Sequence, residues 1–155
     1  MTVMNIRFAE KRDLPGLLAL YAELNPEDGP LDADSARLIW DRMLATGIQQ
    51  VLVAETGDSL LATCSLAILP NLTRRGRSFA VIENVVTAAN HRRQGFGRAV
   101  IQAALEHART QGCYKALLLS SRKRTDAHQF YADLGFSGDS KLGYEYRFRE
   151  DAADL

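Results

Sequence analysis

Hydrophobic residues recur with two different periods along the first half of the chain, and these periods predict both strands and helices. Residues 5–9 alternate between apolar and polar positions, which is typical of a strand. Asp13 is the expected N-cap of the helix that follows. That helix carries its apolar residues on one face: Leu14, Leu17, Leu18, Tyr21 and Leu24. A second helix is expected over residues 32–46, and strands over 49–55 and 60–69.

The second half alternates strands with helices, which predicts a β-α-β-α-β arrangement. Apolar runs at 78–87 and 116–120 are predicted strands, and the second is short enough to be covered on both faces. Helices are expected over residues 95–111 and 126–134, and a terminal strand over 144–148. The predicted class is therefore α/β (α+β), with a central sheet flanked by helices.

The overall composition fits one globular domain spanning residues 1–155, because 46% of the residues are hydrophobic and 25% are charged. No segment approaches the ~20 apolar residues of a membrane span, and the N-terminus lacks the apolar core of a signal peptide. We therefore expect a cytoplasmic protein without a membrane partner. Cys64 and Cys113 lie in apolar surroundings without metal-ligand spacing, so reduced thiols and no metal site are expected.

The net charge of +0 hides a strong segregation of charge along the sequence. Residues 1–72 carry 5 basic and 10 acidic side chains, whereas residues 73–124 carry 11 basic and 2 acidic ones. Such a cationic block favours a polyanionic ligand. A nucleic acid is not expected, because the block lacks the interleaved aromatic residues that stack on bases. The remaining alternatives are a compact phosphorylated cofactor and a solvated basic face.

A glycine-bearing loop between the strand at 80–87 and the following helix lies inside this block. Glycines let a loop bring its N–H groups against phosphate oxygens, and arginines and the positive end of a helix add favourable charge. The loop predicts a pyrophosphate cradle formed by Arg92, Arg93, Gln94, Gly95, Phe96, Gly97 and Arg98.

The run Arg-x-x-Gly-x-Gly in this loop resembles the acyl-CoA signature of the GNAT superfamily of N-acyltransferases. Residues 126–136 are similar to the C-terminal motif of that superfamily, in which a Phe-Tyr pair precedes Leu-Gly-Phe. The resemblance covers most of residues 3–148 and implies a twisted, mixed, mostly antiparallel sheet and acetyl-CoA as cosubstrate. Residues 75–77, 82–86 and 112–115 are similar to glucosamine-6-phosphate N-acetyltransferases. Residues 126–131 are more like aminoalkylphosphonate and aminoglycoside acetyltransferases, so the acceptor stays open.

Glu83 is the candidate general base, because acetyl transfer requires an amine that has lost its proton. This acid interrupts an otherwise apolar strand, where an ionised carboxylate is costly unless it lines a cavity. A structural alternative is an ion pair between Glu83 and Arg74, Arg75 or Arg77. The expected acceptor pocket contains Glu83, these three arginines and Tyr144, and proton removal could be direct or through water.

The remaining site residues are implied by the resemblance. Backbone groups of Val85, Val86 and Thr87 are expected to pair with the pantetheine chain and to polarise the acetyl carbonyl. Tyr131 occupies the position whose hydroxyl donates a proton to the departing thiolate, although packing alone would also retain an aromatic residue there.

We therefore expect an N-acetyltransferase that joins acetyl-CoA and a small, anionic primary amine by direct attack in a ternary complex. A noncatalytic acyl-CoA-binding regulator and a protein or peptide N-acetyltransferase are the alternatives. Assembly into a homodimer also stays open.

Overall fold

The computed structural model describes residues 3–148 of the chain. The chain divides into two compact units, the first ending at Leu118 and the second beginning at Leu119. Each unit is described by itself below. The expectation of one domain over residues 1–155 stays a prediction.

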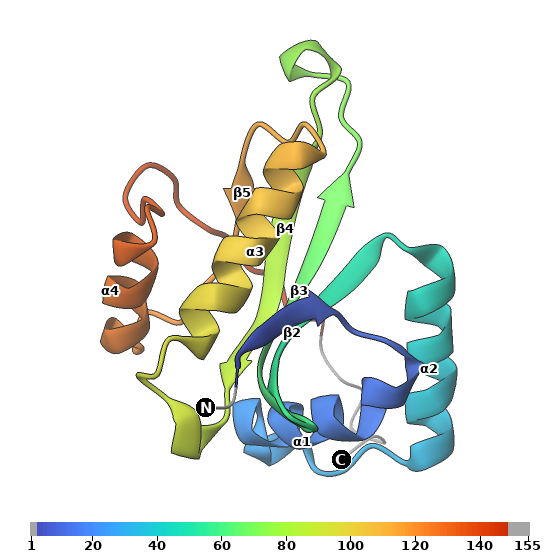
Figure 1. The fold of residues 1–155 in the computed structure, drawn as a ribbon. Coiled ribbons are helices and arrows are strands. Elements are labelled where there is room, and N and C mark those ends of the chain that lie inside the picture. The colour runs from blue at the N-terminus through green and yellow to red at the C-terminus, as the bar shows by residue number, and fades with distance from the viewer. Residues whose placement is uncertain (1–2, 149–155) are drawn as a thin grey trace. The chain divides into compact units, whose positions relative to one another are not determined.

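The first unit is built on a five-stranded sheet in the order β1-β2-β3-β4-β5 (Figure 1). Its strands are β1 (Asn5–Phe8), β2 (Gln49–Thr56), β3 (Ser59–Leu69), β4 (Phe79–Thr87) and β5 (Ala116–Leu117). The first four strands pair antiparallel in chain order, and β5 joins β4 in parallel. The predicted mixed, mostly antiparallel sheet is confirmed.

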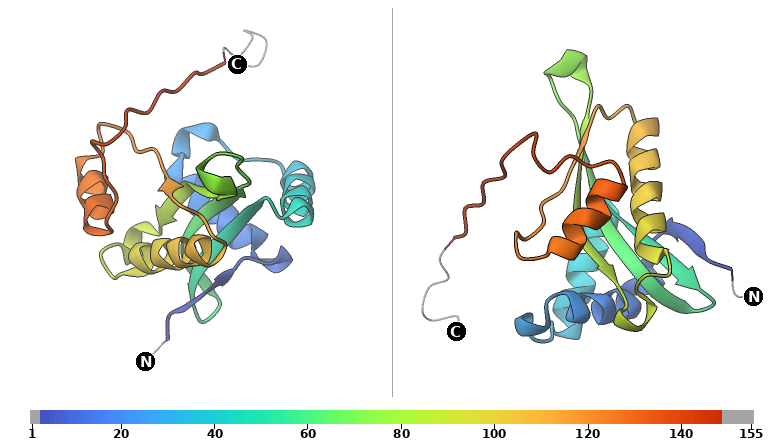
Figure 2. Two further views of the ribbon diagram at one scale, coloured as in Figure 1. Left: turned by 90° about the horizontal axis from the view of Figure 1, so that it is seen from above. Right: turned by 90° about the vertical axis from the view of Figure 1, so that its left-hand side faces the viewer.

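Helices cover both faces of this sheet (Figures 1 and 2). The first two helices, α1 (Leu14–Leu24) and α2 (Ala33–Thr46), lie on one face, and α3 (Phe96–Thr110) lies on the other. Short 3-10 turns complete the unit: η1 (Lys11–Asp13), η2 (Pro26–Asp28), η3 (Arg74–Gly76) and η4 (Ala89–His91). The predicted helices at 32–46 and 95–111 are therefore confirmed to within about two residues, the usual uncertainty of helix ends.

The alternation of side chains along the strands supplies a buried layer to each face of the sheet. On the α1 and α2 face, Leu17 and Trp40 pack with Val51 and Val53. The opposite layer is buried between β3, β4 and α3, and it contains Cys64, Leu66, Ile82, Val100 and Ile101. Burial stabilises each such aliphatic side chain by roughly 1.5–3 kcal/mol. The two layers fix the sheet between the helices and thereby position the residues of β4.

Asp13 stands at the N-cap position of α1 but does not cap it. Its backbone is helical (φ −82°, ψ −9°), whereas a capping side chain requires an extended backbone. The carboxylate instead accepts hydrogen bonds from both terminal nitrogens of Arg7, at 2.7 and 2.9 Å, and from the backbone N–H of Glu10 at 2.6 Å. The adjacent guanidinium holds the pKa of Asp13 below its usual range. Asp13 therefore anchors β1 to the start of α1.

Strand β5 is shorter than the sequence pattern predicts. Only Ala116 and Leu117 join the sheet, opposite Ala80 and Val81, and the Leu117 side chain is 41% exposed. The prediction of a strand over 116–120 covered on both faces is therefore wrong in its extent. An apolar run is not sufficient for a strand, because each residue also requires a backbone partner.

The second unit contains one helix, α4 (Thr125–Asp133), within its described residues. The helix ends as predicted at Gly135, which has a left-handed backbone (φ 94°). The N–H of Phe136 donates to the carbonyl of Tyr131, and that of Gly135 donates to the carbonyl of Ala132. This pair of bonds is a Schellman motif, which satisfies carbonyls that the helix end leaves unpaired.

The predicted terminal strand over residues 144–148 is wrong for the described part of the chain, which ends at residue 148. No strand is formed there, and Tyr144, Tyr146 and Phe148 are 82–88% exposed. The alternation that suggests a strand is present in the sequence. A strand nevertheless needs a ladder partner, and none of the described strands pairs with this segment.

Candidate active site

A β-bulge interrupts the pairing of β4 with β3. Ser65 of β3 lies opposite Glu83, and Thr63 lies opposite Val86, so two residues of β4, Asn84 and Val85, face the single residue Cys64. Asn84 has a left-handed backbone (φ 51°), a conformation that asparagine tolerates better than most residues. The bulge separates the candidate base, Glu83, from the residues expected to bind acetyl-CoA.

Beyond the bulge, β4 keeps a ladder partner on one side only. Its pairing with β5 ends at Val81, whereas its pairing with β3 continues to Thr87. Within the described residues, the N–H and C=O groups of Val85 to Thr87 that point away from β3 therefore lack a ladder partner. Backbone groups at such an edge are ready to pair with an extended ligand. This geometry agrees with the role expected for Val85, Val86 and Thr87, which stays a prediction.

The predicted pyrophosphate loop leads from β4 into the N-terminus of α3. Gly95 immediately precedes the helix with φ 89°, where a side chain would strain the backbone. Phe96 is buried and its ring lies edge-on to His91 at 6.1 Å, so this side chain holds the first helical turn in place. The N–H groups of the first turn of a helix have no partner within the helix. They are available to phosphate oxygens.

The charge around this loop also suits a pyrophosphate. Arg92, Arg93 and Arg98 are exposed, and none of them forms an ion pair with a described residue. Gln94 is exposed and its side chain donates to the carbonyl of Asn90 at 3.4 Å. Unpaired cations beside a helix N-terminus form a favourable environment for an anion. The residues of this loop therefore fit the diphosphate group of coenzyme A.

Glu23 supports the loop, a contact that the sequence analysis missed. Its carboxylate accepts a hydrogen bond of 2.7 Å from the backbone N–H of Ala89, at the start of η4. Glu23 belongs to α1 and is separated from Ala89 by 66 positions. No local sequence signal marks such a contact.

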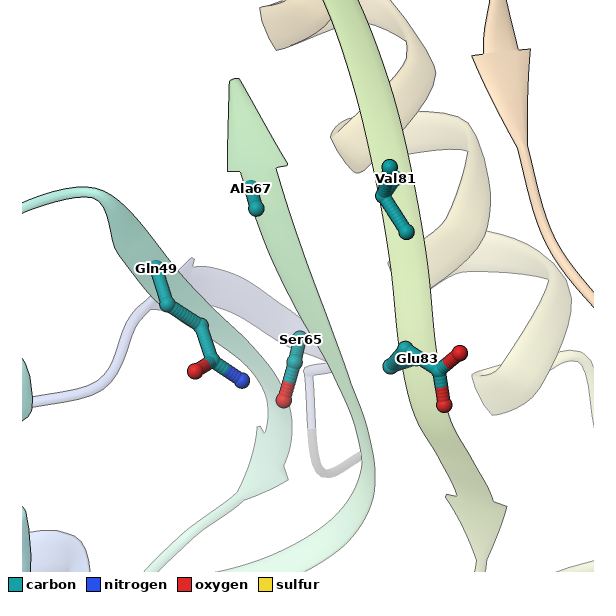
Figure 3. A pocket seen from close by; sticks show the side chains of 5 residues that line it. All are labelled: Gln49, Ser65, Ala67, Val81 and Glu83. Atoms are coloured by element: carbon teal, nitrogen blue, oxygen red, sulfur yellow. The ribbon is translucent and has the colours of Figure 1, made fainter. Parts of the chain in front are cut away.

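Glu83 lines a pocket of about 200 Å³ on the face of the sheet that carries α1 and α2 (Figure 3). The other lining residues are Gln49 from β2, Ser65 and Ala67 from β3, and Val81 from β4. The Glu83 side chain is exposed, and it forms no ion pair with a described residue. The described chain therefore does not contain the ion pair with Arg74, Arg75 or Arg77 that was the structural alternative.

Gln49 and Ser65 are site residues that sequence reasoning missed. Ser65 interrupts an apolar strand, as Glu83 does, whereas Gln49 is the first residue of β2. In Figure 3 the side chain of Gln49 extends toward Ser65. A polar residue in a buried strand was the available signal for Ser65, but only the tertiary fold shows that Ser65 and Gln49 share a pocket with Glu83.

The arginine cluster of the β3–β4 loop lies apart from this pocket. Arg77 precedes β4 and lies six positions before Glu83, which corresponds to about 20 Å of extended chain. Arg74 and Arg77 instead lie over the ring of Tyr114, at 5.8 and 5.5 Å from its centre, and Lys115 lies 5.2 Å from the same ring. Lys115 and Arg74 lower the pKa of the Tyr114 phenol. The structure does not bring Arg74, Arg75 and Arg77 together with Glu83.

Tyr131 and Tyr144 belong to the second unit. The half-buried ring of Tyr131 contacts Phe130 at 5.2 Å and Phe136 at 5.8 Å, so its position on α4 is well defined by packing. Tyr144 is exposed. The expected roles of both residues toward a site in the first unit stay predictions.

The two cysteines are free, as predicted. Burial raises the pKa of Cys64 to about 12, so this thiol is protonated at neutral pH and is a poor nucleophile. Residues 3–148 contain no group of three His, Cys, Asp or Glu side chains arranged to hold a metal ion. No helix among them is both long enough and apolar enough to span a bilayer.

Comparison with known proteins identifies the family. Residues 15–136 match the model of the acetyltransferase (GNAT) family. The chain belongs to this family. A glucosamine 6-phosphate N-acetyltransferase of Trypanosoma brucei brucei is 35% identical over 134 residues, covering 86% of this chain and 88% of the relative. Glucosamine 6-phosphate N-acetyltransferase 1 of Oryza sativa subsp. japonica is 33% identical over 135 residues, covering 84% and 79%.

A solved structure of a putative acetyltransferase from Agrobacterium tumefaciens is similar with a TM-score of 0.89 and 42% identity. The match covers 93% of this chain and 99% of that chain. The GNAT fold expected from the sequence is thus confirmed, and the chain is an acyl-CoA-dependent acetyltransferase. Acetyl-CoA is the cosubstrate implied by the family, and its reactive group is a thioester.

The loop assignment predicts that Gly97→Asp weakens coenzyme A binding. Gly97 lies in the first turn of α3, where an acidic side chain is compatible with the helix but repels a phosphate. We expect the binding free energy to fall by at least ~2 kcal/mol in calorimetry at low salt. Gly97→Asn is the matched control, because it adds similar bulk without charge. Equal affinities of the two variants at low and high salt would contradict the assignment.

Proposed function

We propose that this enzyme transfers an acetyl group from acetyl-CoA to the primary amine of an amino-sugar phosphate, by direct attack in a ternary complex. The observation that carries the proposal is the similarity, over most of the chain, to glucosamine 6-phosphate N-acetyltransferases of two organisms. The pocket of about 200 Å³ beside Glu83 is available to a small acceptor. An aminoalkylphosphonate is the second acceptor class, because residues 126–131 resemble those acetyltransferases.

Glu83 acts as the general base in this proposal. A protonated amine has no free lone pair, so one proton must leave before nitrogen attacks the carbonyl carbon. The exposed Glu83 carboxylate, without an ion-pair partner among the described residues, can accept that proton directly or through water. The C–N bond then forms and the C–S bond breaks.

Backbone groups after the bulge stabilise the charge that develops on the carbonyl oxygen. The N–H groups of Val85 to Thr87 that point away from β3 lack a ladder partner among the described strands. They can therefore donate to the carbonyl oxygen without breaking an existing ladder hydrogen bond. Donors that are fixed before the reaction stabilise an oxyanion more effectively than water does. The sheet supplies this rigidity through the continuous pairing of β4 with β3.

Tyr131 donates a proton to the departing thiolate. A neutral phenol can donate near neutral pH, and the packing of its ring against Phe130 and Phe136 limits its motion. In this proposal Glu83 accepts the proton of the amine, and Tyr131 donates a proton to the thiolate. Arg74, Arg75, Arg77 and Tyr144 stay predicted contacts of the acceptor, as do a cytoplasmic location and a homodimer.

A panel of acceptors tests the proposed function directly. The purified protein is incubated with acetyl-CoA and one amine at a time, and free thiol is measured. We expect the highest kcat/KM with an amino-sugar phosphate, followed by aminoalkylphosphonates. Polyamines, amino acids, aminoglycosides and N-terminal peptides form the remainder of the panel. Preference for peptides would contradict the assignment of a small acceptor. If no amine in the panel caused thiol release, the proposed function would be wrong.

The role of Glu83 predicts that Glu83→Gln lowers kcat about 10²-fold while coenzyme A affinity changes little. The loss should shrink as pH rises, since free amine then becomes abundant without a base. Steady-state rates across pH and calorimetry with coenzyme A measure the two quantities. Glu106→Gln is the control, because Glu106 is exposed and pairs with Arg109 on α3. A loss that is independent of pH would contradict the role as a base.

Tyr131→Phe tests the leaving-group role, because it keeps the ring and removes the hydroxyl. We expect the melting temperature to change little and the turnover number with acetyl-CoA to fall about 10- to 10³-fold. An acyl donor with a more acidic thiol should recover part of the loss, since its thiolate needs a proton less. Tyr146→Phe is the matched control and should leave both rates unchanged. Equal losses with both donors would show that Tyr131 only packs or positions.

A further inference from the structure

The hydroxyl group of Ser65 is buried without a hydrogen-bond partner. Ser65 is only 2% exposed, and its Oγ makes no hydrogen bond of normal length with a described residue. Buried polar side chains nearly always find a partner, because losing water without replacing it is unfavourable. An unpaired hydroxyl on a pocket wall therefore points to a group that is supplied by a ligand.

Thr63, two residues earlier on β3, shows the usual arrangement. It is fully buried, and its hydroxyl donates a 2.7 Å hydrogen bond to the carbonyl of Leu52. The Tyr21 hydroxyl lies near both Thr63 and Ser65, although it forms no hydrogen bond of normal length with Ser65. Burial raises the pKa of Tyr21, so its hydroxyl stays neutral. Among the described residues, Trp40 Nε1 and Thr56 Oγ1 are also buried without a hydrogen-bond partner, and Ser65 is the one of the three that lines the pocket.

Gln49 presents a second polar group to the same pocket. It lies opposite Ala67 on the neighbouring strand, and its side chain extends toward Ser65 (Figure 3). A primary amide carries both donors and an acceptor, and a serine hydroxyl carries one donor and two lone pairs. The Gln49 amide and the Ser65 hydroxyl can therefore each exchange hydrogen bonds with a hydroxyl group of a ligand. Glu83 is the one charged residue among the described lining residues, so this pocket is a poor place for a phosphate.

We propose that Ser65 and Gln49 bind a hydroxyl group of the acceptor beside its reactive amine, and that this contact selects hydroxylated amines. The inference rests on the proposed function and adds the residues that decide acceptor specificity. Ser65 lies directly opposite Glu83 in the sheet, so a hydroxyl held by Ser65 places the neighbouring amine within reach of the base. A phosphate on the same acceptor lies outside this pocket, away from the Glu83 carboxylate.

The test combines removal of the enzyme hydroxyl with removal of acceptor hydroxyls. Ser65→Ala and the parent enzyme are assayed with glucosamine 6-phosphate and with its 1-deoxy and 3-deoxy derivatives, which lack one or the other hydroxyl beside the amine-bearing carbon. In the parent, we expect one deoxy acceptor to lose 10-fold or more in kcat/KM. In Ser65→Ala, the same deletion should cost less than 3-fold, because the partner is already absent.

Thermal unfolding gives a readout independent of activity. Ser65→Ala should keep or raise the melting temperature, because it removes a buried polar group that has no partner. Thr63→Val is the matched control and should lower the melting temperature, because it breaks the bond to Leu52. Gln49→Met, which keeps the length of the side chain without its amide, should reduce the same deoxy effect.

The outcomes separate this inference from the proposed function. A parent enzyme that is inactive with glucosamine 6-phosphate would overturn the proposed function. An active parent whose deoxy effects are unchanged in Ser65→Ala would overturn the role of Ser65 alone. A melting temperature that falls in Ser65→Ala as it does in Thr63→Val would show that the hydroxyl is structural, which also overturns the inference.

Discussion

The one-sided pairing of β4 is the constraint on which the candidate site depends. On its β3 side the strand is held from Phe79 to Thr87, so its backbone is fixed. On its other side the pairing with β5 stops at Val81, so the remaining backbone groups on that side have no ladder partner among the described residues. A strand bound on both sides could not bind an extended ligand through its backbone, and an unpaired strand would not hold its shape. β4 combines the two requirements within nine residues.

The predicted coenzyme A loop and the pocket beside Glu83 carry charges of opposite sign. The loop before α3 and the first turn of α3 together carry three arginines without ion-pair partners among the described residues, whereas the pocket beside Glu83 is lined by one acid and two neutral polar residues, besides Ala67 and Val81. A basic loop attracts an anion and an acidic pocket attracts a cation, so these charges agree with the sites predicted for coenzyme A and for an amine. The arginines near Tyr114 form a separate cationic cluster, which shows that the basic block of the sequence is not one continuous surface.

Local patterns in the sequence predicted most elements but few of the contacts that define the site. The four helices and the strands β1 to β4 follow from hydrophobic periodicity, which depends only on neighbouring residues. The terminal strand and the full length of β5 were wrong because strand formation needs a partner from a distant segment. Asp13 was misassigned because Arg7 competes for its carboxylate. Glu83 was a candidate from the sequence because an acid in an apolar strand is unusual, whereas the pocket that Ser65 and Gln49 share with it forms only when β2, β3 and β4 lie side by side.

The hydrogen bond between Glu23 and Ala89 has a thermodynamic consequence for the binding of the two substrates. It joins α1, whose Tyr21 faces the hydroxyls of β3, to the first turn of the cosubstrate loop. If acceptor binding shifts α1, this hydrogen bond transmits the shift to the loop, and the dissociation constant of the cosubstrate changes by some factor. Linkage requires that the cosubstrate change acceptor affinity by the same factor. The Glu23 carboxylate is thus a direct contact between the helix beside the pocket and the loop, and any coupling through it acts equally in both directions.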